Sequence, residues 1–209
     1  MSRNRSQTEP APERNPNRHQ QRKAATHQKL LEAARAVIIE RGYNAVEILD
    51  ITERANVSKA AFYRHFANKE ACVREIMLNG FDALLERIFE GGRRATSREE
   101  WVSTSFREAF AWAEQNREIL LIMVGGRASA QLNVFGRDYL VQSVERAFDE
   151  FGSFSEDDGV PVVVKAHVTA GALIQLLGWW LENDTGYSAG DMADLMRRVL
   201  LHGVGLIFP

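Results

Sequence analysis

The sequence predicts an all-α protein of about nine helices. Apolar residues recur at three- and four-residue spacing along most of the 209 residues, and no segment gives a strong strand signal. Ser, Asn or Pro precedes several of these segments, and Gly follows others, as expected at helix starts and stops. A hydrophobic content of 45% is enough for a substantial core in one or two domains.

Residues 1–23 differ from the rest of the chain. They contain three of the five prolines, six of the 26 Lys and Arg residues and no run of apolar side chains. A segment of this composition cannot bury enough surface to fold alone. We therefore expect a disordered basic tail here, without the apolar core of a secretory signal.

The first predicted helix starts at Ala24. Its apolar face is formed by Leu30, Leu31, Ala34, Val37 and Ile38. Arg41 supplies a cation in the last turn, and Gly42 supplies the stop.

Two short helices follow and are joined by a tight turn. The first of them is marked by Ile48, Ile51, Thr52 and Ala55. Asn56 tolerates the left-handed backbone of a tight turn, and the Ser58 hydroxyl can cap the next helix. This arrangement is a helix-turn-helix, whose second helix can place its N-terminal residues against base edges in the major groove of DNA.

The remaining apolar segments predict six more helices, of which the one at residues 117–124 is short. They span approximately residues 68–90, 97–116, 117–124, 133–151, 161–183 and 188–208. Asn68, Ser97, Pro161 and Ser188 suit the starts of four of them. Ser97 and Glu100 also have the spacing of a capping box.

The charge is distributed unevenly. Residues 1–70 contain thirteen Lys/Arg and eight Asp/Glu, a balance of +5, whereas residues 71–209 contain thirteen and twenty, a balance of −7. This asymmetry favours a nucleic-acid or other anionic partner for the front of the chain. A solvated basic tail is the alternative, because six of the cations precede residue 24.

Residues 26–75 resemble the DNA-binding domain of the TetR family of transcriptional regulators. The matching segments are "LLEAARAVIIERGYNAV" and "DITERANVSKAAFYRHFANKE", and "FYRHFANKE" is the most specific part. The resemblance implies a DNA-binding domain at residues 24–72. It also implies a helical effector-binding and dimerisation domain at residues 73–209.

The resemblance also implies roles for individual side chains. The Tyr63 hydroxyl and the Lys69 ammonium contact phosphates, which position the protein, while the patch from Lys59 to Ala61 faces the bases. Phe62 and Phe66 are expected in the core. The full set implied for DNA binding is Thr26, Ser58, Lys59, Ala60, Ala61, Tyr63, His65 and Lys69.

Three departures from the family pattern bear on DNA binding. Glu47 stands where the family usually has Thr or Ser; its charge suits the helix dipole but repels phosphate. Asn56 replaces the usual turn glycine. Ala60 and Ala61 are small, so base readout is expected to use apolar contact with thymine methyl groups.

For residues 73–209, called the back domain below, the resemblance implies a ligand chamber and a homodimer formed by the last two helices. Aromatic side chains at helical spacing fit either a core or a cavity wall, and they suggest a largely apolar or aromatic effector. For His167, a satisfied core residue is the alternative. The candidate ligand contacts are Phe106, Phe110, Met123, Arg127, Tyr139, His167, Gln175 and Trp179.

Other classes of protein find little support. The histidines lack a metal-binding spacing, and no P-loop, G-x-S-x-G or G-x-G-x-x-G motif is present, so we expect no enzyme, metal or cofactor. Cys72 is the single cysteine, which fits a reducing cytoplasm. The most apolar run is interrupted by Lys165 and His167, so no membrane span is expected.

The sequence therefore predicts a cytoplasmic, ligand-responsive regulator. We expect a repressor that binds a palindromic double-stranded DNA operator as a homodimer and that a small-molecule effector releases. The alternative is a ligand-independent DNA-binding regulator or architectural protein. A fully packed back domain would favour that alternative.

Overall fold

The computed structural model describes residues 16–124, 128–150 and 159–202. In these ranges the chain forms nine α-helices and one 3₁₀ turn, with no strand. The elements of the front half are α1 (Pro16–Arg41), η1 (Tyr43–Ala45), α2 (Ile48–Arg54), α3 (Lys59–Tyr63) and α4 (Lys69–Gly92). Those of the back half are α5 (Arg98–Gln115), α6 (Arg117–Met123), α7 (Ala130–Glu150), α8 (Val162–Glu182) and α9 (Ala189–His202). The predicted all-α fold is confirmed.

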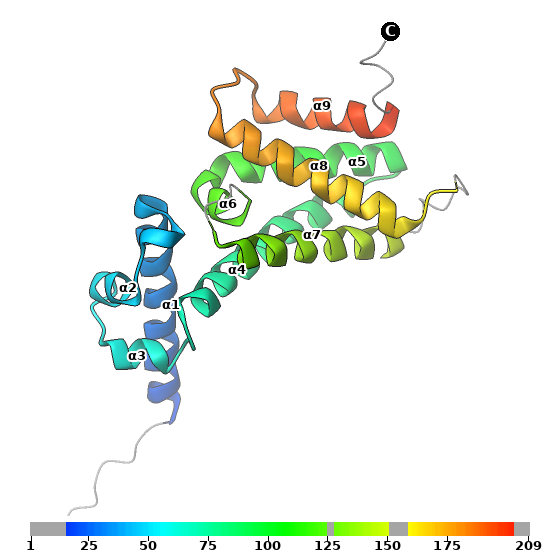
Figure 1. The fold of residues 1–209 in the computed structure, drawn as a ribbon. Coiled ribbons are helices and arrows are strands. Elements are labelled where there is room, and N and C mark those ends of the chain that lie inside the picture. The colour runs from blue at the N-terminus through cyan, green and yellow to red at the C-terminus, as the bar shows by residue number, and fades with distance from the viewer. Residues whose placement is uncertain (1–15, 125–127, 151–158, 203–209) are drawn as a thin grey trace, which may run out of the picture.

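The helices form two groups that α4 connects (Figure 1). Helices α1, α2 and α3 form the smaller group, and α5 to α9 form the larger one. The long helix α4 packs against α1 near its start and against α5, α6 and α7 further along. A movement of α4 would therefore displace residues of both groups.

The structure confirms the predicted start and stop residues for most of the helices. Gly42 has φ 78° after the last residue of α1, and Asn56 has φ 52° in the turn between α2 and α3. Side-chain oxygens cap α3, α4 and α5 by accepting a backbone N–H three residues later, at Ser58, Asn68 and Ser97. Ser97 forms only half of the predicted capping box, because the Glu100 carboxylate accepts from the N–H of Thr96 instead.

One predicted boundary is wrong. Helix α1 begins at Pro16, eight residues before the predicted start at Ala24, while residues 1–15 of the predicted tail lie outside the described residues. The extra turns are exposed from Arg18 to Ala25 and carry no apolar stripe, so hydrophobic periodicity cannot reveal them. Pro16 at the first helical position is itself a start signal, since its fixed φ suits a helix and its missing N–H would be unpaired there.

Helix α8 is the most apolar helix of the described chain. By length and composition alone, Val162–Glu182 could cross a membrane. It packs along α7 and also contacts α6 and α5, and it buries Ala166, Ala170, Leu173 and Leu177. These contacts make α8 part of a packed helical group, and the large apolar side chains of α8 that stay exposed are Val163, Val164, Val168 and Trp179.

Candidate nucleic-acid interface

The turn between α2 and α3 fixes the angle at which the two helices meet. The backbone N–H of Asn56 donates to Glu53 O at 3.1 Å, and that of Val57 donates to Thr52 O at 3.0 Å. The Ser58 hydroxyl then accepts from the Ala61 N–H at 3.1 Å and starts α3. Fully buried Phe62 and nearly buried Phe66 hold α3 from beneath, which confirms the prediction that both belong to the core.

Helix α3 presents one face to solvent. Its exposed side chains are Ser58, Lys59, Ala60, Tyr63 and the capping residue Arg64. Ala61 is only 6% exposed, so its predicted contact with the groove is wrong. Ala61 shares the inner face of the helix with its neighbour Phe62, whereas Lys59, Ala60 and Tyr63 point outward. The same periodicity places Arg64 outward, a candidate DNA contact that the sequence reading missed.

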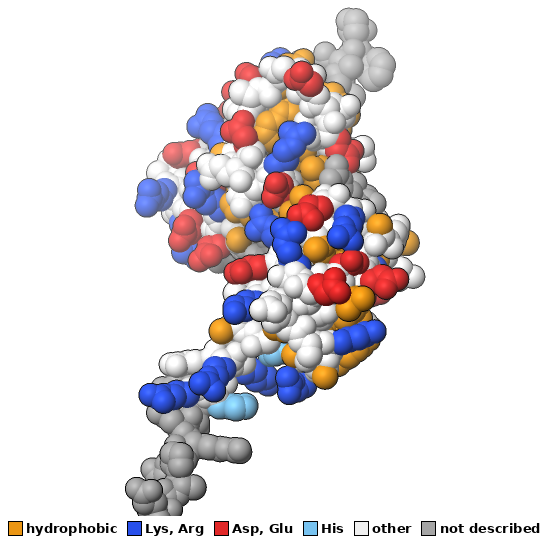
Figure 2. Space-filling model, turned by 90° about the vertical axis from the view of Figure 1, so that its left-hand side faces the viewer, with side chains coloured by type: hydrophobic (Ala, Val, Ile, Leu, Met, Phe, Trp, Pro, Cys, Tyr) orange, Lys and Arg blue, Asp and Glu red, His pale blue; other side chains and the backbone are white. Residues whose placement is uncertain are grey.

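The surface around α3 is rich in cations. In Figure 2, Lys, Arg and His side chains gather at the lower end of the molecule, which α3 and the start of α1 occupy in Figure 1. Thr26 and His65, both of the predicted DNA-binding set, are half-buried. The Thr26 hydroxyl donates to Arg22 O at 2.9 Å, and His65 Nδ1 lies 3.3 Å from His27 Nδ1. His65, which follows α3, thus lies against His27, the chain neighbour of Thr26 in α1.

Lys69 has internal partners that the sequence did not suggest. Its ammonium donates to the carbonyl oxygens of Tyr43 at 2.7 Å and Val46 at 2.6 Å, and Nζ lies 4.1 Å from the centre of the Tyr43 ring. Burial lowers the pKa of Lys69, and the carboxylates of Glu47 and Asp50 oppose that shift. An ammonium has three donors, so one remains for a phosphate. Its contact with DNA stays a prediction, whereas its role in holding the entry to α2 is visible.

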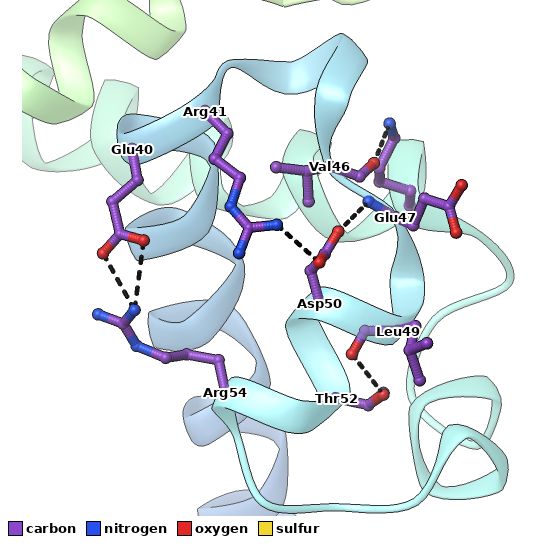
Figure 3. A network of polar contacts seen from close by, with 9 residues as sticks. Glu40, Arg41, Val46, Glu47, Leu49, Asp50, Thr52 and Arg54 are labelled. Carbon is purple, nitrogen blue, oxygen red and sulfur yellow. Dashed lines mark hydrogen bonds and ion pairs between the residues drawn. The ribbon is translucent and has the colours of Figure 1, made fainter.

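Ion pairs fasten α2 to the end of α1 (Figure 3). Arg41 donates to Asp50 at 2.7 Å, and Arg54 reaches both carboxylate oxygens of Glu40 at 3.0 and 3.3 Å. Asp50 also accepts from the Glu47 N–H at 2.8 Å; this bond and Arg41 lower the pKa of the Asp50 carboxyl. The Glu47 carboxylate itself is exposed and points away from this network in Figure 3. That its negative charge weakens a phosphate contact stays a prediction.

Tyr63 offers the cleanest test of a phosphate contact. Its side chain is 52% exposed, and its hydroxyl has no hydrogen-bond partner within the described part of the chain. Tyr63→Phe keeps the edge-on contact with the Phe62 ring at 5.7 Å. We expect a several-fold loss of affinity for all DNA sequences, with the free energy of unfolding changed by less than about 0.5 kcal/mol. Fluorescence anisotropy and urea unfolding measure the two quantities, and a change of sequence preference at intact affinity would contradict the assignment.

A cavity of about 340 Å³ lies in the larger group of helices, between the end of α4 and helices α5, α7, α8 and α9. Most of its wall is aliphatic or aromatic. The polar side chains in the wall are Ser105, Ser143, Lys165 and Thr169. Ser105 is 6% exposed, and its buried hydroxyl has no hydrogen-bond partner among the described residues. A buried hydroxyl normally finds a partner, so this one marks a place where a ligand could supply it.

Most of the predicted ligand contacts do not line this cavity. Phe106 does, but Phe110 and Met123 are packed elsewhere in the core, and the Tyr139 hydroxyl bonds Asp82. The three predicted contacts on α8 are exposed and lie outside the cavity wall: His167, Gln175 and Trp179. They fall on the outer face of α8, which composition alone could not distinguish from the inner face. Arg127 lies outside the described residues.

Helices α8 and α9 leave apolar side chains in solvent. On α8, Trp179 is 43% exposed beside exposed Gly171 and Gln175, while Val164 and Val168, 46% and 56% exposed, also line the open side of the cavity. On α9, Leu195 and Val199 are 37% and 40% exposed. Contiguous apolar side chains of this kind mark surfaces that bind another protein.

Comparison with known proteins identifies the front of the chain. Residues 30–76 match the family model described as bacterial regulatory proteins, tetR family. The Transposon Tn10 TetC protein of Escherichia coli is 38% identical over 93 residues, which are 36% of this chain and 47% of TetC. The chain spans about half or less of the length of the first curated relatives that it matches. Other relatives are named as a repressor, DhaR of Mycobacterium sp., and as an activator, FasR of Mycolicibacterium smegmatis.

Solved structures extend the likeness in fold to most of the chain. A putative TetR-family regulator from Syntrophomonas wolfei superimposes with a TM-score of 0.72 at 22% identity, over 88% of this chain and 98% of that one. The regulator FadR from Bacillus subtilis, solved in complex with stearoyl-CoA, gives 0.67 at 18% identity, over 85% and 98%. At 22% and 18% identity these likenesses show a shared fold, and the match to the tetR family model covers residues 30–76, which include the turn before α3 and α3 itself.

Proposed function

We propose that this protein binds double-stranded DNA with α3 in the major groove. The observation that carries the proposal is the outward face of α3, where Lys59, Ala60 and Tyr63 are exposed above the buried Phe62. Lys59 and Ala60 would meet base edges, and Arg64 lies next to them. Ser58, Tyr63 and the remaining donor of Lys69 would meet phosphates, with Thr26 and His65 at the rim of the same surface.

Salt dependence tests this function directly. Fluorescence anisotropy with a labelled duplex of mixed sequence should give an association constant that falls steeply as salt is raised, because binding releases counterions from the phosphates. Lys69→Ala, which removes a proposed phosphate contact, should make that slope shallower by about one. If the protein bound no duplex at low salt, the proposed function would be excluded.

We further propose that the protein acts as a homodimer on a palindromic site, in the cytoplasm. The exposed apolar side chains of α8 and α9 support pairing through these two helices, as a four-helix bundle with a second copy. Two copies of α3 could then meet half-sites about 34–36 Å apart, one helical turn of DNA. Repression of transcription fits the relative that is named a repressor, and the relative named an activator is the other outcome.

The cavity supports a ligand response over the ligand-independent alternative. Its wall is largely apolar, and stearoyl-CoA is the ligand named for FadR, a structure of the same fold. We propose an effector with a long apolar part that enters this cavity and lowers DNA affinity. Leu85 and Ile88 of α4 line the cavity, while Lys69 at the other end of α4 holds the entry to α2. A ligand that binds better to one position of α4 than to the other would shift the population between DNA-competent and DNA-incompetent states.

The unpartnered hydroxyl in the cavity gives a stability test with a built-in control. In the ligand-free protein, Ser105→Ala should leave the free energy of unfolding unchanged or raise it by up to about 1 kcal/mol, because the buried hydroxyl makes no hydrogen bond. Ser143→Ala, on the same cavity wall, removes a hydroxyl that donates to Tyr139 O at 2.8 Å and should cost about 1 kcal/mol. Urea unfolding of both variants decides the matter. Equal losses would mean that Ser105 is bonded in solution.

A further inference from the structure

Two histidines and a carboxylate join three elements of the DNA-binding surface. His27 of α1 lies between the other two: its Nδ1 is 3.3 Å from Nδ1 of His65, and its Nε2 is 2.5 Å from Oε1 of Glu75 on α4. The His27 ring also stacks on Phe66, with the ring centres 4.8 Å apart. His65 follows α3 directly, so this cluster connects the end of α3 to α1 and α4.

The geometry limits where protons can sit. Glu75 accepts from His27 Nε2–H, which leaves Nδ1 of His27 to face Nδ1 of His65. With both rings neutral, His65 Nδ1–H donates to His27. With one added proton, His27 is an imidazolium that donates to both neighbours, and the contact survives. A second proton would set two N–H donors against each other at 3.3 Å, so the pair holds one added proton readily and two poorly.

The surrounding charges act in the same direction. Burial lowers the pKa of His65, and the positive charges of His27, Lys23 and Arg64 lower it further. Glu75 is the carboxylate that faces the pair, and the buried Cys72 thiol on α4 has a pKa raised to about 12, so it does not titrate with the histidines. In the free protein, burial and these charges therefore disfavour the charged form of His65. Nearby phosphates would stabilise the added proton.

We propose that the His27–His65 pair, held by Glu75, is a proton-binding site through which DNA binding takes up a proton. The inference rests on the proposed DNA-binding function. By linkage, affinity for DNA rises as the pH falls while the pair takes up its first proton. The protein would then bind DNA with higher affinity in a mildly acidified cell.

The first test measures DNA affinity against pH. For the full chain and a labelled duplex of mixed sequence, anisotropy at constant ionic strength should show affinity rising about three- to tenfold from pH 7.5 to pH 6.0, since one proton gives at most tenfold per pH unit. The double variant His27→Gln/His65→Gln, which removes both titrating rings, should reduce this change to less than about twofold. His19→Gln, which removes an exposed histidine of the same helix outside the cluster, should keep it. A pH response that persists in the double variant, or one of opposite sign in the unaltered protein, overturns the proposal.

The second test needs no DNA, so it separates failure of the inference from failure of the proposed function. Histidine side-chain NMR of the free protein should show the pKa of His65 below its usual range, and His27→Gln should raise it. An unchanged His65 titration in that variant overturns the shared-proton site. Thermal melts at both pH values check that the variants are folded. If the NMR result holds and no duplex binds at any pH, the DNA-binding function and the proton coupling built on it fail together.

Discussion

Replacing Phe62 with alanine is expected to lower the free energy of unfolding by about 3–5 kcal/mol, the usual cost of emptying a fully buried aromatic site. The Phe62 side chain is 0% exposed and lies 5.5 Å from the Phe66 ring, centre to centre. It is the side chain on which the exposed face of α3 rests. Since proteins are stable by only about 5–15 kcal/mol, this loss should also abolish DNA binding near the growth temperature.

Urea unfolding followed by circular dichroism measures the loss, and Leu49 provides a matched control. Leu49 is an apolar residue of α2 that is 52% exposed, so Leu49→Ala should change stability by less than about 1 kcal/mol. A loss below about 1 kcal/mol for Phe62→Ala would show that α3 does not depend on this packing.

Lys69→Ala should impair both stability and DNA binding. Its ammonium donates to two backbone carbonyls, and charge-assisted bonds of this kind, together with the acceptors left behind, make a loss of about 1–3 kcal/mol the expected result. Affinity should fall for every DNA sequence, and the salt slope should become shallower by about one. Unfolding and anisotropy measured on the same preparation give both quantities.

Lys59→Ala separates the two effects. Lys59 is exposed on α3 and makes no ion pair or hydrogen bond within the described part of the chain, so its removal should weaken DNA binding without loss of stability. If Lys69→Ala were as stable as the wild type, the carbonyl bonds would not matter. If it altered sequence preference with affinity intact, the phosphate assignment would be wrong.

The sequence predicted the local geometry of the front helices well because the signals there are local. Ser58 and Asn68 cap helices through bonds that span three residues, and Asn56 needs only a permissive backbone. Ala61 was misplaced because its first-turn position was considered without the helical period that turns it inward. The carbonyl partners of Lys69 lie 23 and 26 residues away in the chain, so no local pattern could show them.

The cavity was harder to predict for a physical reason. Aromatic side chains at helical spacing give the same sequence pattern whether they fill a core or line a cavity. Phe106 lines the cavity, whereas Phe110 is fully buried among other core side chains. One local signal existed and was missed. Ser105 occupies an inward position on α5 among Val102, Phe106 and Ala109, and a lone hydroxyl on an apolar face is a candidate ligand contact.

Selection of DNA from a random pool on the purified protein tests the central proposal most directly. We predict enrichment of a site with two-fold symmetry, whose half-sites lie about 10–10.5 base pairs, or a multiple of that spacing, from centre to centre. The Lys59→Ala variant should relax the preference within each half-site if that residue meets bases. Enrichment of no sequence above background, or of a site without two-fold symmetry, would contradict a dimer that reads DNA through two copies of α3.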